Sequence, residues 1–88
     1  MSATNTPVFR ERRKQPIRRS VTSALELFLN DLGGHPVNDL YHVVLNEVEP
    51  AMLNVVMRHV AGNQSQAAEM LGISRSTLRR KLRQYNLE

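Results

Sequence analysis

The chain has 88 residues and a formal net charge of +4, with 12 Lys and Arg against 8 Asp and Glu. A chain of this size forms one small domain with a modest core. It has no cysteine, which excludes disulfides, thiolate metal ligands and a cysteine nucleophile. No stretch reaches the ~20 apolar residues of a membrane span, and the polar start lacks the apolar run of a secretory signal. We therefore expect a cytoplasmic, bacterial-type protein with no membrane partner.

The basic residues are concentrated at the two ends of the chain. Residues 1–19 hold six Lys and Arg against one Glu, a local charge of +5, and residues 75–88 hold five against one, a local charge of +4. The stretch between them has one Arg and six acidic residues, a local charge of −5. This distribution predicts a polyanionic partner for the ends and a different role for the middle.

The first elements in chain order are a basic arm and a helix. Residues 1–16 have no apolar period and contain Pro7, so they are predicted to be a disordered basic N-terminal arm. A helix is expected just after Pro16, because proline suits the first helical turn. Val21 and later apolar residues follow at helical spacing. The segment Gly33-Gly34-His35-Pro36 is expected to end this helix.

A second, long helix is predicted from an N-cap at Asn38 to about Val60, with Asp39 in its first turn. Pro50 interrupts this stretch. Because no glycine or turn cluster accompanies the proline, the sequence favours a kink within one helix. The alternative is a break into two helices at Pro50.

The second helix has more apolar surface than one stripe. One broad face contains Leu40, Val44, Val48, Met52, Val55 and Val56. Val43, Leu53 and Met57 fall on a different side. A second apolar side needs a second surface to cover it, and a two-fold contact with another copy would supply one. Residues 17–61 are therefore predicted to form a two-helix dimerisation region.

Residues 62–88 are predicted to form a helix-turn-helix. A short helix is expected over residues 64–71, with two alanines and Leu71 directed inward, and Gly72 ends it. Ile73 is expected to plug the small core. Ser74 is expected to cap a last helix that runs from Arg75 to about Tyr85. The second helix of such a motif can lie in the major groove of DNA.

The last helix has one apolar face and several basic residues. Leu78, Leu82 and Tyr85 follow i, i+4, i+7 spacing and are expected to pack inward. Its first turn, from Ser74 to Thr77, would reach the groove floor, where Arg75 can bond to guanine. Phosphates are the expected partners of the later basic residues, and those are Arg79, Arg80, Lys81 and Arg83. Asn63 directly precedes the short helix and Ser65 lies in its first turn, and both are further candidates for a phosphate contact.

Other functions have weaker support in the sequence. The histidines (His35, His42 and His59) share no ligand-like spacing, so no metal or cofactor is expected. Met52, Met57 and Met70 are interpreted as core residues. No nucleophile–base–acid set or phosphate-binding glycine loop is present, so the protein is not expected to be an enzyme. A helix hairpin whose basic face is merely solvated is the structural alternative. A helical interaction or RNA-binding module is a functional one, although stacking aromatics are few.

Four segments carry a resemblance to a known family. They are Val37–Tyr41, Glu47–Glu49, Gly62–Gln64 and Leu78–Leu82. Over about residues 17–88 the chain resembles the Fis family (factor for inversion stimulation), bacterial nucleoid-associated proteins that bend DNA. The part from Gly62 to Leu87 is also similar to the DNA-binding domain of NtrC-type enhancer-binding proteins. Those proteins carry an ATPase domain ahead of it, so the length favours a free-standing protein over a regulator's output domain.

The resemblance implies an all-α protein of four helices, with an intertwined homodimeric helical core and a C-terminal helix-turn-helix. Two recognition helices closer than one turn of B-DNA, ~34 Å, would require bent DNA and loose, partly indirect recognition. The implied functions are nucleoid organisation and transcription regulation. Carried over by matching position, the DNA-contacting residues would be Asn63, Ser65, Ser74, Arg75, Thr77, Arg79, Arg80 and Lys81.

The chain departs from the family pattern at several positions. Ser74 stands where well-known members have asparagine, Gln66 replaces a basic residue, and Pro50 lies one residue before the usual proline. Members that stimulate DNA inversion use an N-terminal β-hairpin arm to touch a recombinase. The corresponding region here is short, basic and poor in strand formers, so recombinase activation is not expected.

Overall fold

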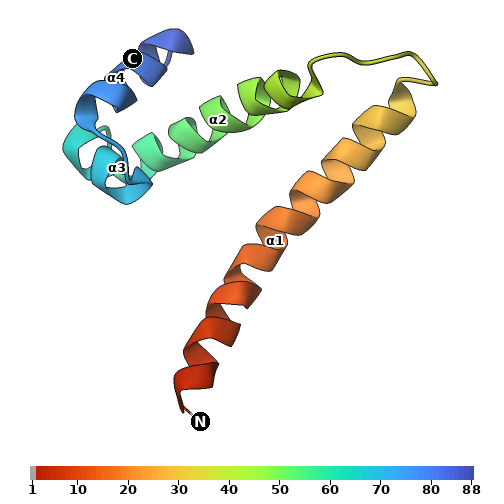
Figure 1. Ribbon diagram of the computed structural model, residues 1–88. Helices are drawn as coiled ribbons and strands as arrows, with labels where there is room; N and C mark the ends of the chain where they lie inside the picture. Colours follow the sequence, from red (N-terminus) through yellow and green to blue (C-terminus); the bar gives the residue numbers. More distant parts are fainter. Residues whose placement is uncertain (1) are drawn as a thin grey trace. The chain divides into compact units, whose positions relative to one another are not determined.

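The structure is a computed structural model that describes the backbone of residues 2–88 and the side chains of residues 14–88. Within residues 2–88 it contains helices only: α1 (Ser2–Asp31), α2 (Leu40–His59), α3 (Gln64–Leu71) and α4 (Arg75–Gln84) (Figure 1). The predicted all-α fold of four helices is confirmed over this range. The chain divides into two compact units, Met1–Val37 and Asn38–Glu88, which are described separately.

The first unit consists of α1 and the turn after it. The structure differs here from the prediction, because α1 begins at Ser2 and includes the arm that we expected to be disordered up to Pro16. The six consecutive residues Arg10–Gln15 all have high helix propensity, which lets the helix extend before Pro16. The predicted end is confirmed, since α1 stops at Asp31 and Gly33 follows with φ of 59°.

The second unit begins with α2. The predicted cap at Asn38 is wrong by one residue: Asp39 occupies the N-cap position, with φ of 65° and no capping hydrogen bond from its side chain. Aspartate is one of the few residues that adopt this left-handed conformation readily. Its carboxylate instead lies 2.6 Å from Nδ1 of His42. α2 continues through Pro50, so the two-helix alternative is excluded.

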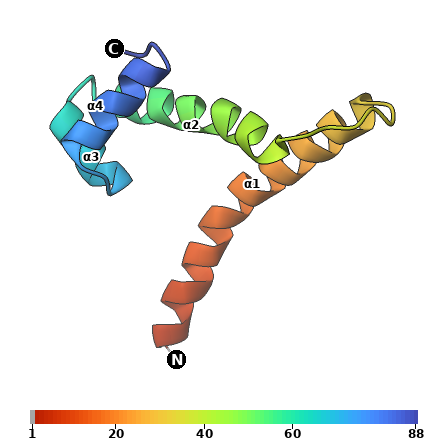
Figure 2. The same ribbon diagram turned by 45° about the horizontal axis from the view of Figure 1, so that its top comes forward.

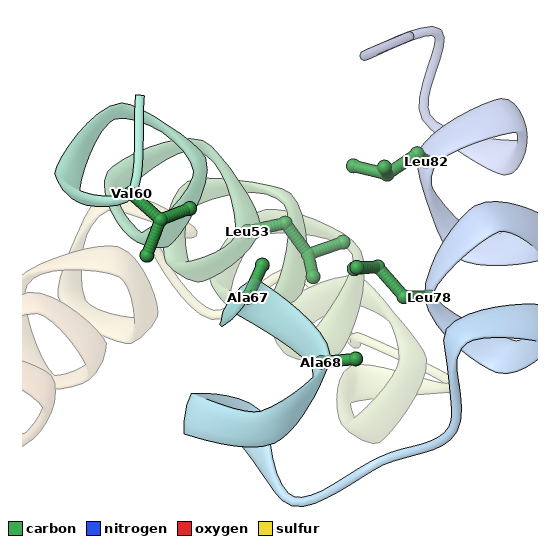
Figure 3. Close-up of a cluster of buried hydrophobic side chains, with 6 residues drawn as sticks. All are labelled: Leu53, Val60, Ala67, Ala68, Leu78 and Leu82. Carbon is green, nitrogen blue, oxygen red and sulfur yellow. The ribbon is translucent and has the colours of Figure 1, made fainter. Parts of the chain in front are cut away.

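The core of the second unit is formed where α3 and α4 pack against α2, as Figures 1 and 2 show. Side chains from the three helices and the turn after α2 converge there (Figure 3). The buried set is Leu53, Val60, Ala67, Ala68, Leu78 and Leu82. The small side chains of Ala67 and Ala68 let α3 approach the other helices closely, as the sequence predicted.

Within the single chain, the burial of three residues differs from the expectations. Leu53 is 1% exposed and central to the core, whereas the sequence placed it on a side that we expected a second copy to cover. The reason is that α3 and α4 of the same chain cover that side of α2. Met52 and Met70, which we interpreted as core residues, are 46% and 54% exposed. Met57 is half-buried against the core, as expected.

Apart from Val43, which is 40% exposed on another side of α2, the uncovered apolar surface of α2 forms a regular strip. Its residues follow the alternating four- and three-residue spacing that places side chains on one face of a helix. We call this face the outer strip, and it consists of Tyr41, Leu45, Val48, Met52 and Val55. The inner residues Leu53, Val56 and Val60 follow the same spacing on a separate side of α2. α2 therefore carries two apolar stripes, one packed within the chain and one exposed.

Candidate nucleic-acid interface

A tight turn joins α3 to α4. Gly72 takes the left-handed conformation, with φ of 75°, that ends a helix without steric cost for glycine. The backbone N–H groups of Gly72 and Ile73 both donate to the carbonyl of Ala68, at 2.9 and 3.1 Å. Ser74 then starts α4, and its hydroxyl accepts a hydrogen bond from the Thr77 N–H at 3.1 Å. The predicted helix–turn–helix is therefore present, with its predicted caps.

The inner face of α4 fixes which side chains point outward. Leu78 and Leu82 are 0% and 1% exposed, and Tyr85 is half-buried beside the same cluster. Because these residues are spaced i, i+4, i+7, the opposite side of α4 must be directed to solvent. The structure confirms the inward face that the sequence predicted.

Most of the predicted site residues lie at the surface of this unit. Six are exposed: Asn63, Ser65, Ser74, Arg75, Arg79 and Arg80. Thr77 and Lys81, one turn apart on α4, are half-buried. Within the described part of the chain, Arg75, Arg79 and Arg80 form no ion pair, so their charges are directed to solvent. α4 therefore presents three arginines on a rigidly packed helix.

Two of the predicted residues also stabilise helix ends. Asn63 is the N-cap of α3, where its Oδ1 accepts a hydrogen bond from the Gln66 N–H at 3.1 Å. This bond occupies the side-chain oxygen and leaves the amide NH₂ group as a donor. The Ser74 hydroxyl accepts from Thr77 N–H and donates to Thr77 Oγ1 at 2.9 Å. Substitutions at either position therefore affect the fold as well as any ligand contact.

Lys81 is engaged within the protein. Its Nζ lies 2.8 Å from Oε2 of Glu49, which is on α2. The Tyr85 hydroxyl donates to Oε1 of the same carboxylate at 2.6 Å. The hydrogen bond from Lys81, then the one from Tyr85, lowers the pKa of Glu49, and the bond to Glu49 raises the pKa of Tyr85.

Glu49 is a contact residue that the sequence did not predict. A signal for it was available, because Glu49 precedes Leu53, Val56 and Val60 by four, seven and eleven residues. An acidic residue at that spacing lies on the inner side of α2, where a polar partner from a packed helix can satisfy it. Lys81 and Tyr85, spaced i, i+4 on α4, supply that partner.

Neither a metal site nor a membrane span is found among the described residues. No group of three His, Asp or Glu side chains within them is arranged to hold a metal ion. None of the helices in this range combines the length and apolar character that crossing a bilayer requires.

The fold and the exposed basic helix define a small helix-turn-helix protein. The family described as bacterial regulatory protein, Fis family, matches residues 44–85. The DNA-binding protein Fis of Aliivibrio fischeri (strain MJ11) is 49% identical over 74 residues, which cover 84% of this chain and 76% of the relative. The DNA-binding protein Fis of Histophilus somni (strain 2336) is 52% identical over 73 residues, which cover 83% of this chain and 74% of the relative. The chain belongs to the Fis family, whose members are regulatory proteins and not enzymes, as the sequence predicted.

Proposed function

We propose that this protein is a DNA-binding regulator that inserts α4 into the major groove of duplex DNA. The observation that carries the proposal is the orientation of α4, which buries Leu78 and Leu82 and presents Arg75, Arg79 and Arg80 to solvent. A helix held in this way can reach base edges with its first turn and phosphates with its later residues. The family relationship supports the same assignment, since the relatives are named as DNA-binding proteins.

The proposed contacts divide into two kinds. Arg75, in the first turn of α4, is assigned to base edges, where arginine bonds bidentately to guanine. Ser74 and Thr77 share the first turn with Arg75. The exposed residues Asn63, Ser65, Arg79 and Arg80 are assigned to positioning the helix on the sugar–phosphate backbone. The amide NH₂ of Asn63 is a suitable phosphate donor, because the Asn63 oxygen alone is used by the cap.

The division between base and phosphate contacts is tested by comparing two arginine variants. Arg75→Ala should reduce the discrimination between a preferred and a poor site by about 1–3 kcal/mol. Arg80→Ala should weaken binding to all duplexes equally and lower the slope of log K against log salt by roughly 0.9 for each subunit. Equal losses of discrimination in both variants would contradict the assignment. A preference of the wild-type chain for single-stranded RNA over duplex DNA would overturn the function itself.

We also propose that the protein acts as a homodimer, with residues 17–61 as the dimerisation region and residues 62–88 as the DNA-binding region. The outer strip of α2 leaves five large apolar side chains exposed at coiled-coil spacing. α1 adds exposed Ile17, Val21 and Phe28, which also share one helical face. Surfaces of this kind are typical of a chain that completes its core with a second copy.

Disruption of the outer strip tests the dimer. Met52→Glu places a charge in the middle of that strip without touching the core around Leu53. Sedimentation should change from dimer to monomer, and DNA affinity should fall because two recognition helices no longer act together. Asn54→Glu, an exposed change off the strip, is the matched control. A wild-type chain that is already monomeric at micromolar concentration would contradict the proposal.

DNA bending and nucleoid organisation complete the proposed role, in the cytoplasm where the chromosome lies. If the two α4 helices of a dimer are closer than one turn of straight B-DNA, ~34 Å, the duplex must bend for both to bind. A circular-permutation gel shift measures this directly, with one binding site placed at different positions in equal-length fragments. Position-dependent mobility of the dimer complex is the expected result, and uniform mobility would exclude bending.

A further inference from the structure

The contact of Glu49 with α4 has a consequence for DNA binding. Lys81 lies on the helix proposed to enter the groove, between the exposed Arg80 and the inward Leu82. Its ammonium group is 2.8 Å from a Glu49 oxygen, and both side chains are about a quarter exposed, at 27% and 26%. A pair that is partly shielded from water is screened less by salt than a fully exposed one.

A lysine in such a pair has two possible anionic partners. To neutralise a DNA phosphate, Lys81 must either leave the Glu49 carboxylate or divide its positive charge between the carboxylate and the phosphate. Glu49 would lose its largest charge partner and would add a negative charge close to the bound polyanion. The second bond of Glu49, from Tyr85, holds the carboxylate in place and so maintains the competition.

We propose that Glu49 is a positioning residue that holds Lys81 as an internal counter-ion and thereby lowers the affinity of α4 for DNA. This inference rests on the proposed DNA-binding function of α4. In the unbound protein Lys81 is paired with Glu49, and Arg79 and Arg80 are the principal phosphate contacts. An ordinary structural ion pair would stabilise the fold slightly and would leave the salt dependence of binding unchanged.

The test is the salt dependence of duplex binding by Glu49→Gln. Glutamine keeps an oxygen that can accept the Tyr85 hydrogen bond but carries no charge to hold Lys81. The variant should bind the same duplex several-fold more tightly at low salt. Its slope of log K against log salt should steepen by roughly 0.9 for each Lys81 released to a phosphate, or about 1.8 for a dimer.

Two further variants separate this effect from a general change of charge. Glu47→Gln makes the same change in net charge at an exposed position of α2 that has no ion pair among the described residues. It should leave the slope close to the wild-type value. In a Lys81→Met background, Glu49→Gln should no longer steepen the slope, because no lysine is left to release. Circular dichroism and thermal unfolding establish that each variant is folded.

The outcomes distinguish this inference from the proposed function. If wild-type protein binds duplex DNA but Glu49→Gln binds with unchanged slope, or Glu47→Gln steepens it equally, the counter-ion role is wrong and DNA binding stands. If the folded wild-type protein does not bind duplex DNA, the proposed function is wrong and the inference fails with it. A steeper slope in Glu49→Gln alone, lost in the Lys81→Met background, supports both.

Discussion

The Tyr85 hydroxyl donates a hydrogen bond to Oε1 of Glu49 at 2.6 Å, and this bond joins the end of α4 to the middle of α2. Because the bond holds the phenolic proton, and the adjacent carboxylate also disfavours a second negative charge, the pKa of Tyr85 lies above its ordinary value of 10.0. In Glu49→Ala, which removes the acceptor of this bond, the pKa of Tyr85 should therefore fall toward 10.0. A near-ultraviolet absorbance titration in a Tyr41→Phe background, which leaves Tyr85 as the single tyrosine, measures it. An unchanged titration would mean that the bond does not persist in solution.

The same carboxylate makes stability depend on acid. The folded-state pKa of Glu49 is below its ordinary value of 4.5, so folding favours the ionised form. This contribution is complete above pH 4.5 and is lost as the pH falls from there through the folded-state pKa. The difference in unfolding free energy between wild type and Glu49→Gln should therefore shrink as the pH falls below 4.5. Urea unfolding at matched protein concentrations gives this difference. A difference that grew as the pH fell would contradict the prediction.

The core of the second unit should be sensitive to the loss of volume. Leu82 is 1% exposed and packs with Leu53 and Leu78 between α4 and α2. Leu82→Ala should cost about 2–5 kcal/mol, because it removes a buried side chain and leaves a cavity. Met70→Ala is the control, since Met70 is 54% exposed, and it should change stability by less than about 0.5 kcal/mol. A large effect of Met70→Ala would indicate that Met70 is covered in the assembled protein.

Positive φ angles at the ends of α2 and α3 predict opposite effects on stability for two substitutions. Gly72 has φ of 75°, and no atom lies within 4 Å of the position that a Cβ would occupy, so Gly72→Ala is opposed by backbone strain alone. It should cost roughly 1–2 kcal/mol. Ala61 has φ of 53°, and Ala61→Gly removes a strain of the same kind. Because glycine also loses more entropy on folding, the net gain should be below about 1 kcal/mol. Thermal unfolding should thus move in opposite directions for the two variants.

The sequence predicted the last two helices almost residue by residue, for physical reasons that are local. Gly72 and Ser74 are strong end and start signals, and Leu78 and Leu82 define one face without reference to the rest of the chain. The start of the N-terminal helix was not predicted. The high helix propensity of Arg10–Gln15 opposes the helix-breaking effect of Pro16, and the sequence alone does not show which effect is larger.

The burial of α2 could not be predicted in the same way. Its apolar residues form two stripes, and periodicity alone cannot say which stripe the chain's own α3 and α4 will cover. The sequence assigned Leu53 to a partner, whereas the packed helices cover it and leave Met52 exposed. Glu49 was missed for a related reason: its role depends on Lys81 and Tyr85, which are distant from it in sequence.

Asn63 offers a way to separate folding from DNA binding at a single position. Its Oδ1 caps α3 by accepting from the Gln66 N–H, while its NH₂ group is the proposed phosphate donor. Aspartate caps a helix about as well as asparagine, but it replaces the donor with a negatively charged oxygen. Asn63→Asp should therefore leave thermal stability close to wild type and weaken binding to every duplex by a similar factor. Asn63→Ala should lower stability by about 1 kcal/mol through loss of the cap. Duplex affinity unchanged in Asn63→Asp would remove Asn63 from the proposed interface and leave it as a capping residue.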